Sequence, residues 1–209
     1  MLPRFPLVLF LLAGATMIAP AQTTPPAAPF SPQVGVTGGT LVPLYPPDSP
    51  RLKRDRVREP ETYTGDAPGR IVTAQNIHNP TIEFHPAGGR TNTGAAVILI
   101  PGGGHKTLYL PGEFVPYFQN HGIAVIILRN RLRNEGYDVR ADAITDAFQA
   151  IRIVRARAKS WKIDPARIGV IGFSAGAELA APAALFFDEF SQQNRDPADP
   201  LASISARPD

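Results

Sequence analysis

Short runs of apolar residues recur along the second half of the chain. Residues 95–100, 123–128 and 168–171 are each almost entirely aliphatic, which is typical of strands buried on both faces. Residues 82–85 alternate apolar and polar side chains, and Pro86 and two glycines follow them, as expected of a strand and the turn that ends it. The pattern predicts four strands.

Helical periodicity fills the intervals between these strands. Residues 113–121 are followed by Gly122, a residue suited to close a helix. Residues 138–161 place apolar side chains along one stripe of a helix, at Val139, Ala143, Ala147, Ile151, Val154 and Ala158. Alternating strands and helices predict an α/β fold, with a mostly parallel sheet covered by helices on both faces.

The N-terminal segment reads as an export signal. Arg4 precedes an apolar run at residues 7–18, and Ala19-Pro20-Ala21 has the small residues of a cleavage site. The run is shorter than the roughly 20 residues that span a bilayer, so we expect residues 1–21 to be a cleaved signal peptide and the mature protein to be secreted or periplasmic, without a membrane anchor. Residues 22–69 are rich in proline and are expected to form a linker or N-terminal extension, with the folded domain at 70–209.

Composition excludes several classes of function. The chain has no cysteine, so disulfides and cysteine-ligated metals are excluded. Its histidines show neither a His-x-His nor a His-Glu-x-x-His spacing, and we expect no metal and no cofactor. The net charge of +3 is small, and no stripe of basic and aromatic residues is present, so a nucleic-acid partner is not expected. The oligomeric state is left open.

The sequence at 172–176, Gly-Phe-Ser-Ala-Gly, carries the strongest chemical signal. It has the Gly-x-Ser-x-Gly pattern, directly after a predicted strand and before a helix-prone segment. A sharp turn there needs small residues at Gly172 and Gly176 and leaves the Ser174 hydroxyl exposed, beside the free N–H groups of the next helix. The context predicts that Ser174 is a nucleophile. A purely structural turn is the alternative.

Residues 101–105, Pro-Gly-Gly-Gly-His, follow another predicted strand. Consecutive glycines leave backbone amides uncovered, as an oxyanion hole or a phosphate-binding loop requires. The nucleotide-binding patterns Gly-x-Gly-x-x-Gly and Gly-x-x-x-x-Gly-Lys-Ser/Thr are both absent, and Lys106 comes too early for the second. An oxyanion hole is therefore favoured, with one amide from Ala175, the residue after the serine, and its partner from this loop.

With these motifs, the chain resembles the serine esterases of the α/β-hydrolase superfamily, within it the secreted acetyl-xylan and feruloyl esterases. The resemblance rests on residues 101–105, 129–132 and 161–176. It implies an α/β-hydrolase fold, Ser174 as nucleophile, oxyanion-binding amides at Gly103, Gly104 and Ala175, and an ester substrate, either a small molecule or an acetylated or feruloylated polysaccharide. Two positions depart from the family: Asn130 stands where a tyrosine is frequent, and Ala177-Glu178 where a Gly-His pair is frequent. Peptidases of the same fold share Asp164-Pro165, so a peptidase stays an alternative.

A serine nucleophile needs a base, and none follows it. In this fold the chain order is Ser, then Asp or Glu, then His, whereas all four histidines precede Ser174, at His78, His85, His105 and His121. The favoured hypothesis is that the 209 residues are the N-terminal portion of a longer hydrolase and are inactive alone. The others are that His105, otherwise a possible pocket residue, acts as the base, or that the domain is a non-catalytic binding module.

Overall fold

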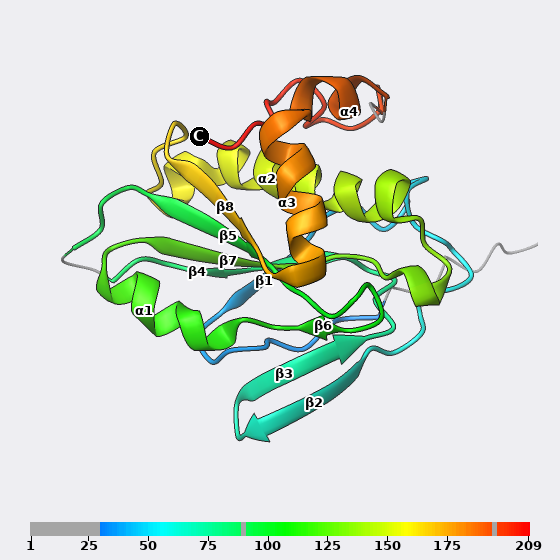
Figure 1. Ribbon diagram of the computed structural model, residues 1–209, viewed down its shortest axis with the longest axis horizontal. Coiled ribbons are helices and arrows are strands. Elements are labelled where there is room, and N and C mark those ends of the chain that lie inside the picture. Colours follow the sequence, from blue (N-terminus) through cyan, green and yellow to red (C-terminus); the bar gives the residue numbers. More distant parts are fainter. Residues whose placement is uncertain (1–29, 89–90, 194–195) are drawn as a thin grey trace, which may run out of the picture.

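The computed structural model describes residues 30–88, 91–193 and 196–209. The predicted signal peptide, residues 1–21, and the start of the predicted linker lie outside these ranges. At the centre is a five-stranded sheet in the order β1-β4-β7-β5-β8 (Figure 1). Its strands are β1 (Thr40–Pro43), β4 (Thr81–His85), β5 (Ala96–Ile100), β7 (Ala124–Arg129) and β8 (Ile168–Gly172).

The strand directions follow the sequence prediction for the second half of the chain. β5 pairs in parallel with β7 on one side and with β8 on the other, with Ile98 opposite Ile126 and Val170. β4 is antiparallel to both β7 and β1. Every residue of β4, β5 and β7 is buried, which explains why β5 and β7 are so rich in aliphatic residues.

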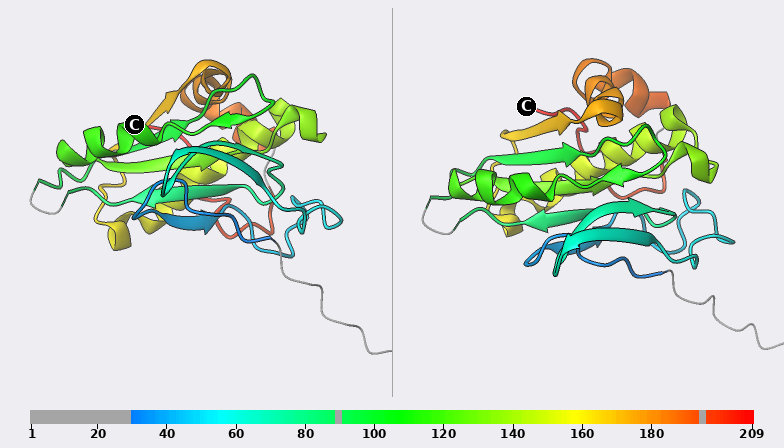
Figure 2. Two further views of the ribbon diagram at one scale, coloured as in Figure 1. Left: turned by 90° about the horizontal axis from the view of Figure 1, so that it is seen from below. Right: turned by 60° about the horizontal axis from the view of Figure 1, so that its bottom comes forward.

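Helices cover both faces of the sheet, as predicted (Figures 1 and 2). On one face lie α2 (Ile144–Trp161), α3 (Ala177–Leu185) and α4 (Phe187–Gln193). On the other lies α1 (Val115–Asn120), together with a three-stranded antiparallel sheet in the order β2-β3-β6. The strands of this smaller sheet are β2 (Thr62–Ala67), β3 (Arg70–Gln75) and β6 (Leu108–Tyr109). Each face has its own apolar core, because side chains of a strand point alternately to the two sides.

The predicted long helix begins with a capped π-helical turn. The Asp138 carboxylate accepts hydrogen bonds from the N–H groups of Arg140 and Ala141, and the residues Val139–Ala143 form the turn that leads into α2. Lys162 closes α2 in a left-handed conformation with φ of 57°. The polar cap and the apolar stripe together fix where this helix lies on the sheet.

The folded domain begins earlier than residue 70, which corrects the predicted boundary. β1 and β2 both lie within residues 22–69, and β1 pairs with β4 at the edge of the main sheet. Val42, Leu44 and Tyr45 belong to the core under α2. The linker prediction missed this because β1 is short and ends at Pro43, and an edge strand tolerates a proline that the middle of a sheet does not.

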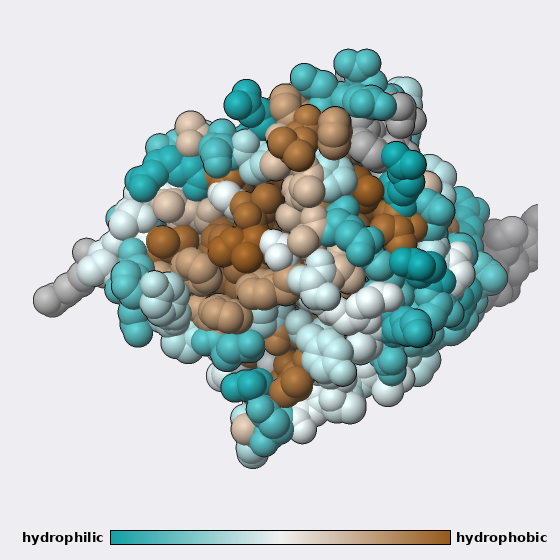
Figure 3. All heavy atoms as spheres, in the orientation of Figure 1, coloured by the Kyte–Doolittle hydropathy of each residue, from teal (hydrophilic) through white to brown (hydrophobic). Residues whose placement is uncertain are grey.

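β8 lies at one edge of the main sheet and is only partly covered. Among the described residues, no strand pairs with the edge of β8 that faces away from β5. Asp209 lies against one end of that edge: its N–H donates to the Ile168 carbonyl at 2.9 Å, and its carboxylate accepts from the Ile168 N–H at 3.2 Å. Ile171 is 37% exposed, and apolar surface gathers over this part of the molecule in Figure 3.

No helix in the described part of the chain is both long and apolar enough to cross a membrane.

Candidate active site

Ser174 occupies a sharp turn between β8 and α3, as predicted. Its backbone is left-handed, with φ of 50°, and the residue is exposed. The flanking glycines are required by space: a Cβ at Gly176 would lie 2.2 Å from the Ile100 carbonyl oxygen, and one at Gly172 would lie 2.4 Å from the Gly176 oxygen. The turn therefore closes only with these two glycines, and it holds the serine in a conformation that non-glycine residues rarely adopt.

The glycine loop after β5 packs directly against this turn. A Cβ at Gly102 would lie 3.2 Å from the Ser174 Cβ and 2.8 Å from the Phe173 carbonyl oxygen. Gly103 and Gly104 have positive φ angles of 129° and 62°. Neither of their N–H groups donates to another residue in the described part of the chain. Two unpaired amides thus lie in the loop that adjoins the serine, as an oxyanion hole requires.

A cleft of about 490 Å³ opens between the serine turn and the smaller sheet. The volume lies within the usual range for small-molecule sites. Its lining combines the predicted site with apolar and charged side chains from other elements: Arg70, Val72, Gly102, Gly103, Gly104, Tyr109, Leu110, Pro111, Glu113, Phe114, Phe173 and Ser174.

The smaller sheet holds the glycine loop in place from one side. The Tyr109 N–H donates to the Gly102 carbonyl at 3.0 Å, and the Leu110 N–H donates to the Val72 carbonyl at 2.9 Å. Thr107 adds a hydrogen bond from its hydroxyl to the Ala74 carbonyl at 3.3 Å. The loop is therefore part of a hydrogen-bonded layer rather than a free segment.

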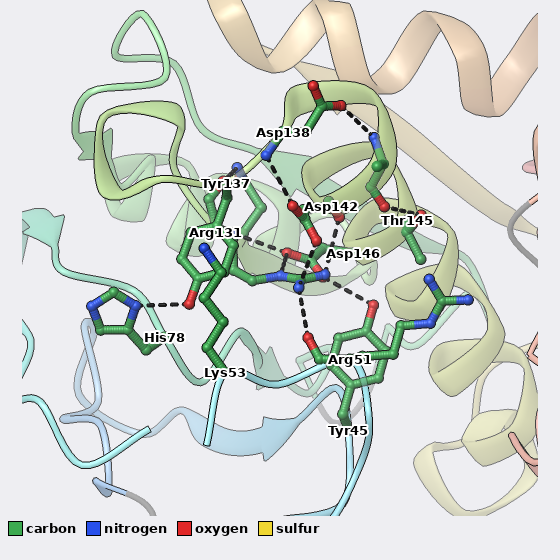
Figure 4. Close-up of polar contacts among 12 residues, drawn as sticks. Tyr45, Arg51, Lys53, His78, Arg131, Tyr137, Asp138, Asp142, Thr145 and Asp146 are labelled. Atoms are coloured by element: carbon green, nitrogen blue, oxygen red, sulfur yellow. Dashed lines mark hydrogen bonds and ion pairs between the residues drawn. The ribbon is translucent and has the colours of Figure 1, made fainter. Parts of the chain in front are cut away.

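The segment after β7 holds the loop from the other side. The His105 carbonyl accepts from the N–H groups of Arg133 and Asn134 at 3.0 and 3.4 Å. Just before them, Arg131 is 1% exposed and forms a buried ion pair with Asp146 of α2, with Nη2 and Oδ1 2.7 Å apart (Figure 4). This pair ties the end of β7 to the helix and so fixes the backbone on which the glycine loop rests.

The electrostatics of this network keep Arg131 charged. Burial by itself would lower the pKa of Arg131, but the Asp146 carboxylate outweighs that effect and the pKa is raised. Burial also raises the pKa of Tyr45, whose hydroxyl donates to Asp146 at 2.9 Å. Asp142 supplies a second, half-exposed carboxylate 2.9 Å from Arg131.

The four histidines are each engaged away from the serine. His105 is buried, and its Nε2 lies 3.1 Å from a carboxylate oxygen of Glu178. His78 contacts the Tyr137 hydroxyl, His85 contacts Glu83, and His121 contacts the Tyr117 carbonyl. In the described ranges, no histidine hydrogen-bonds to Ser174. The hypothesis that His105 is the base therefore finds no support in its contacts.

The structure adds residues to the site that the sequence did not indicate. Arg70 comes from β3, Glu113 and Phe114 from a 3₁₀ turn (η1, Gly112–Phe114), and all three line the cleft beside Ser174. No local motif marks them, because only the pairing of β3 with β6 brings Arg70 beside the glycine loop. Asn130, one of the two departures noted above, is buried after β7 and does not line the cleft.

A comparison with protein-family models shows to which family the chain belongs. A profile described as BD-FAE matches residues 84–202, which is more than half of the chain. The chain belongs to the BD-FAE family. The matched segment contains the glycine loop, the serine turn and both flanking strands.

Solved structures that are similar to this BD-FAE chain show which fold it has. An acetyl ester-xyloside bifunctional hydrolase from Caldicellulosiruptor lactoaceticus is 26% identical, with a TM-score of 0.59 over 83% of this chain and 56% of that one. The apo form of Thermogutta terrifontis esterase 2 is also 26% identical, with a TM-score of 0.51 over 64% of this chain and 49% of that one. The predicted α/β-hydrolase fold is confirmed.

Among characterised sequences, an acetylxylan esterase from Xylanibacter ruminicola is 35% identical over 92 residues, which is 43% of this chain and 18% of that protein. An endo-1,4-beta-xylanase B from Butyrivibrio fibrisolvens is 29% identical over 116 residues, which is 54% of this chain and 18% of that protein. The BD-FAE chain thus spans only a small part of these relatives and about half of the solved structures it matches.

Proposed function

We propose that this BD-FAE protein is a serine-dependent carboxylic ester hydrolase that acts on acetylated carbohydrate. The observation that carries the proposal is the placement of Ser174. Its exposed side chain stands on a strained, left-handed turn, in the same cleft as the two unpaired amides of Gly103 and Gly104. Such a turn presents a nucleophile to a carbonyl carbon, while the amide N–H groups donate hydrogen bonds to the negative charge that forms on the carbonyl oxygen.

The reaction proceeds through an acyl-enzyme. The Ser174 oxygen attacks the ester carbonyl, its proton passes to a general base, and the tetrahedral oxyanion is held by the amides of Gly103, Gly104 and Ala175. Collapse expels the sugar alcohol and leaves the acetyl group on Ser174, and water then releases it as acetate. None of the described histidines hydrogen-bonds to Ser174, so the proposal assigns no base among them.

The names of the relatives support the substrate class. An acetylxylan esterase and an acetyl ester-xyloside hydrolase are among the similar proteins. A further solved structure, 25% identical with a TM-score of 0.51, is the Thermogutta esterase phosphonylated by cyclosarin, and organophosphonates are reagents for an activated serine. Export to the medium or the periplasm, which the predicted signal peptide would direct, fits a polysaccharide substrate and is part of the proposal.

Labelling with a fluorophosphonate probe tests the nucleophile. We expect the full-length gene product to be labelled, Ser174→Ala to lose the label, and Ser160→Ala to keep it. Ser160 is a matched control because its hydroxyl only donates to the Arg157 carbonyl on α2. Full-length protein that folds but takes no label would contradict the proposal and favour a binding module. Labelled protein that cleaves peptides rather than acetylated xylo-oligosaccharides would favour the peptidase.

A further inference from the structure

The cleft beside Ser174 is larger than an acetyl group needs, and charged side chains are among its lining residues. Arg70 and Glu113 line the same 490 Å³ space as the serine. An acetyl group has three heavy atoms, whereas the cleft falls in the range that holds whole small molecules. The remaining space must therefore be filled by the alcohol part of the ester, and its surface chemistry indicates which alcohol fits.

Aromatic and charged side chains both line the cleft. Phe173 and Phe114 are stacked on each other, with ring centroids 5.3 Å apart, and both line the cleft with the serine. The charged groups are contributed by β3 and by the turn before α1. Tyr109 is 57% exposed and also lines the cleft, so one face of an aromatic ring is open to a ligand. A ring face together with charged hydrogen-bonding groups is a suitable surface for a sugar.

The balance of charge favours a neutral ligand. Arg70 forms an ion pair with Asp66, with Nη2 and Oδ2 3.0 Å apart. A guanidinium carries five N–H donors, and no other ion pair of Arg70 occurs in the described ranges. Glu113 has no ion-pair partner in those ranges either. The lining of the cleft thus holds one cation, Arg70, and one carboxylate, Glu113; their charges cancel, which favours a neutral sugar over an anionic one and leaves donors and acceptors for hydroxyl groups.

The backbone of β3, which carries Arg70, is connected to the serine site through the smaller sheet. β3 pairs with β6, with Thr73 opposite Tyr109, and Tyr109 in turn is bonded to Gly102 of the glycine loop at 3.0 Å. The smaller sheet is therefore hydrogen-bonded directly to the loop that carries the oxyanion-binding amides. A sugar held by Arg70 would be held at a defined distance from Ser174, as selection of one acetylated hydroxyl over another requires.

We propose that Arg70, Glu113 and Tyr109 form a subsite for the neutral sugar of the substrate, and that the β2–β3 hairpin is thereby a specificity element of the site. The proposal rests on the function proposed above. Arg70 and Glu113 hydrogen-bond the sugar hydroxyls, and the ring of Tyr109 packs on the sugar face. The acetyl group lies against Ser174 and the glycine loop.

Binding of an unesterified sugar tests the subsite without relying on catalysis. Calorimetric titration with xylotetraose is expected to show a Kd about tenfold higher for Arg70→Gln and for Glu113→Gln, the loss expected for one hydrogen bond to a charged group. Arg54→Gln is the matched control, because Arg54 is exposed in a turn outside the cleft. An acidic oligosaccharide, a xylotriose bearing glucuronate, is expected to bind more weakly than xylotetraose.

Kinetic measurements distinguish a failure of the proposed subsite from a failure of the proposed esterase function. With acetylated xylotetraose, the KM of Arg70→Gln is expected to rise about tenfold, a larger change than with p-nitrophenyl acetate, which carries no sugar, and Arg54→Gln is expected to keep the wild-type KM with both esters. Unchanged xylotetraose affinity in both variants, no xylotetraose binding by the wild type, or tighter binding of the acidic sugar would each overturn the subsite. Intact sugar binding with an unlabelled Ser174 would instead overturn the esterase and leave the subsite standing.

Discussion

Replacing Asp146 by asparagine removes the negative partner of a buried ion pair beneath the site. Asp146 is fully buried and accepts four donors: the Tyr45 hydroxyl, and the backbone N–H, Nε and Nη2 of Arg131. An asparagine keeps one acceptor oxygen but turns an NH₂ group toward the guanidinium, which is itself 1% exposed. A buried cation then loses its main counter-charge.

The expected cost follows from that geometry. Removing one partner of a buried ion pair costs about 3–5 kcal/mol. Asp142 stays 2.9 Å from Arg131 as a half-exposed carboxylate, so we expect the lower end, about 3 kcal/mol of unfolding free energy. Asp66→Asn is the matched control, since the same substitution there breaks the exposed pair with Arg70 and should cost about 0–1 kcal/mol.

Urea unfolding followed by circular dichroism measures both values, and a double-mutant cycle sharpens them. Arg131→Met removes the cation. The double variant Arg131→Met with Asp146→Asn should lose clearly less unfolding free energy than the two single variants lose together, because it leaves no unpaired buried charge. A loss for Asp146→Asn no larger than that for Asp66→Asn, or strict additivity in the cycle, would refute the reasoning.

Two further predictions concern the glycine loop and a buried carboxyl. A Cβ at Gly103 would lie 1.9 Å from the Thr107 carbonyl oxygen, so Gly103→Ala should displace the loop and abolish fluorophosphonate labelling. A Cβ at Gly104 would have no atom within 4 Å, so Gly104→Ala should be labelled and should lose only about 1 kcal/mol of stability, the cost of a left-handed alanine. Equal labelling of the two variants would contradict this. Burial raises the pKa of Glu61 to about 7, above the value of about 4.3 in an unfolded chain. The folded state therefore holds this proton more tightly, and the Glu61 contribution to stability, full below about pH 4, is lost as the pH rises toward 7, by up to about 4 kcal/mol. In thermal unfolding, the midpoint temperature of Glu61→Gln should equal that of the wild type at pH 4 and exceed it at pH 8. A constant difference between the two proteins across this range would contradict the raised pKa of Glu61.

The sequence determined the elements whose signals are local. Aliphatic runs marked β5, β7 and β8, because a strand covered on both faces has no polar side to show. The serine turn was predictable for the same kind of reason: Gly172 and Gly176 are demanded by contacts within a few residues of Ser174 and by the strand next to it. The glycine loop was recognisable because glycines are needed where backbone amides must stay uncovered.

The tertiary structure alone decided what depends on pairing between distant segments. β1 is four residues long and ends at Pro43, so its place in the sheet comes from β4, not from its own pattern. Arg70 reaches the cleft only because β3 pairs with β6, which follows the glycine loop. His105 adjoins that loop in the sequence, yet its side chain contacts Glu178. The sequence shows which residue types are present and where. The direction of a side chain is set by the packing around it, and that packing depends on the whole fold.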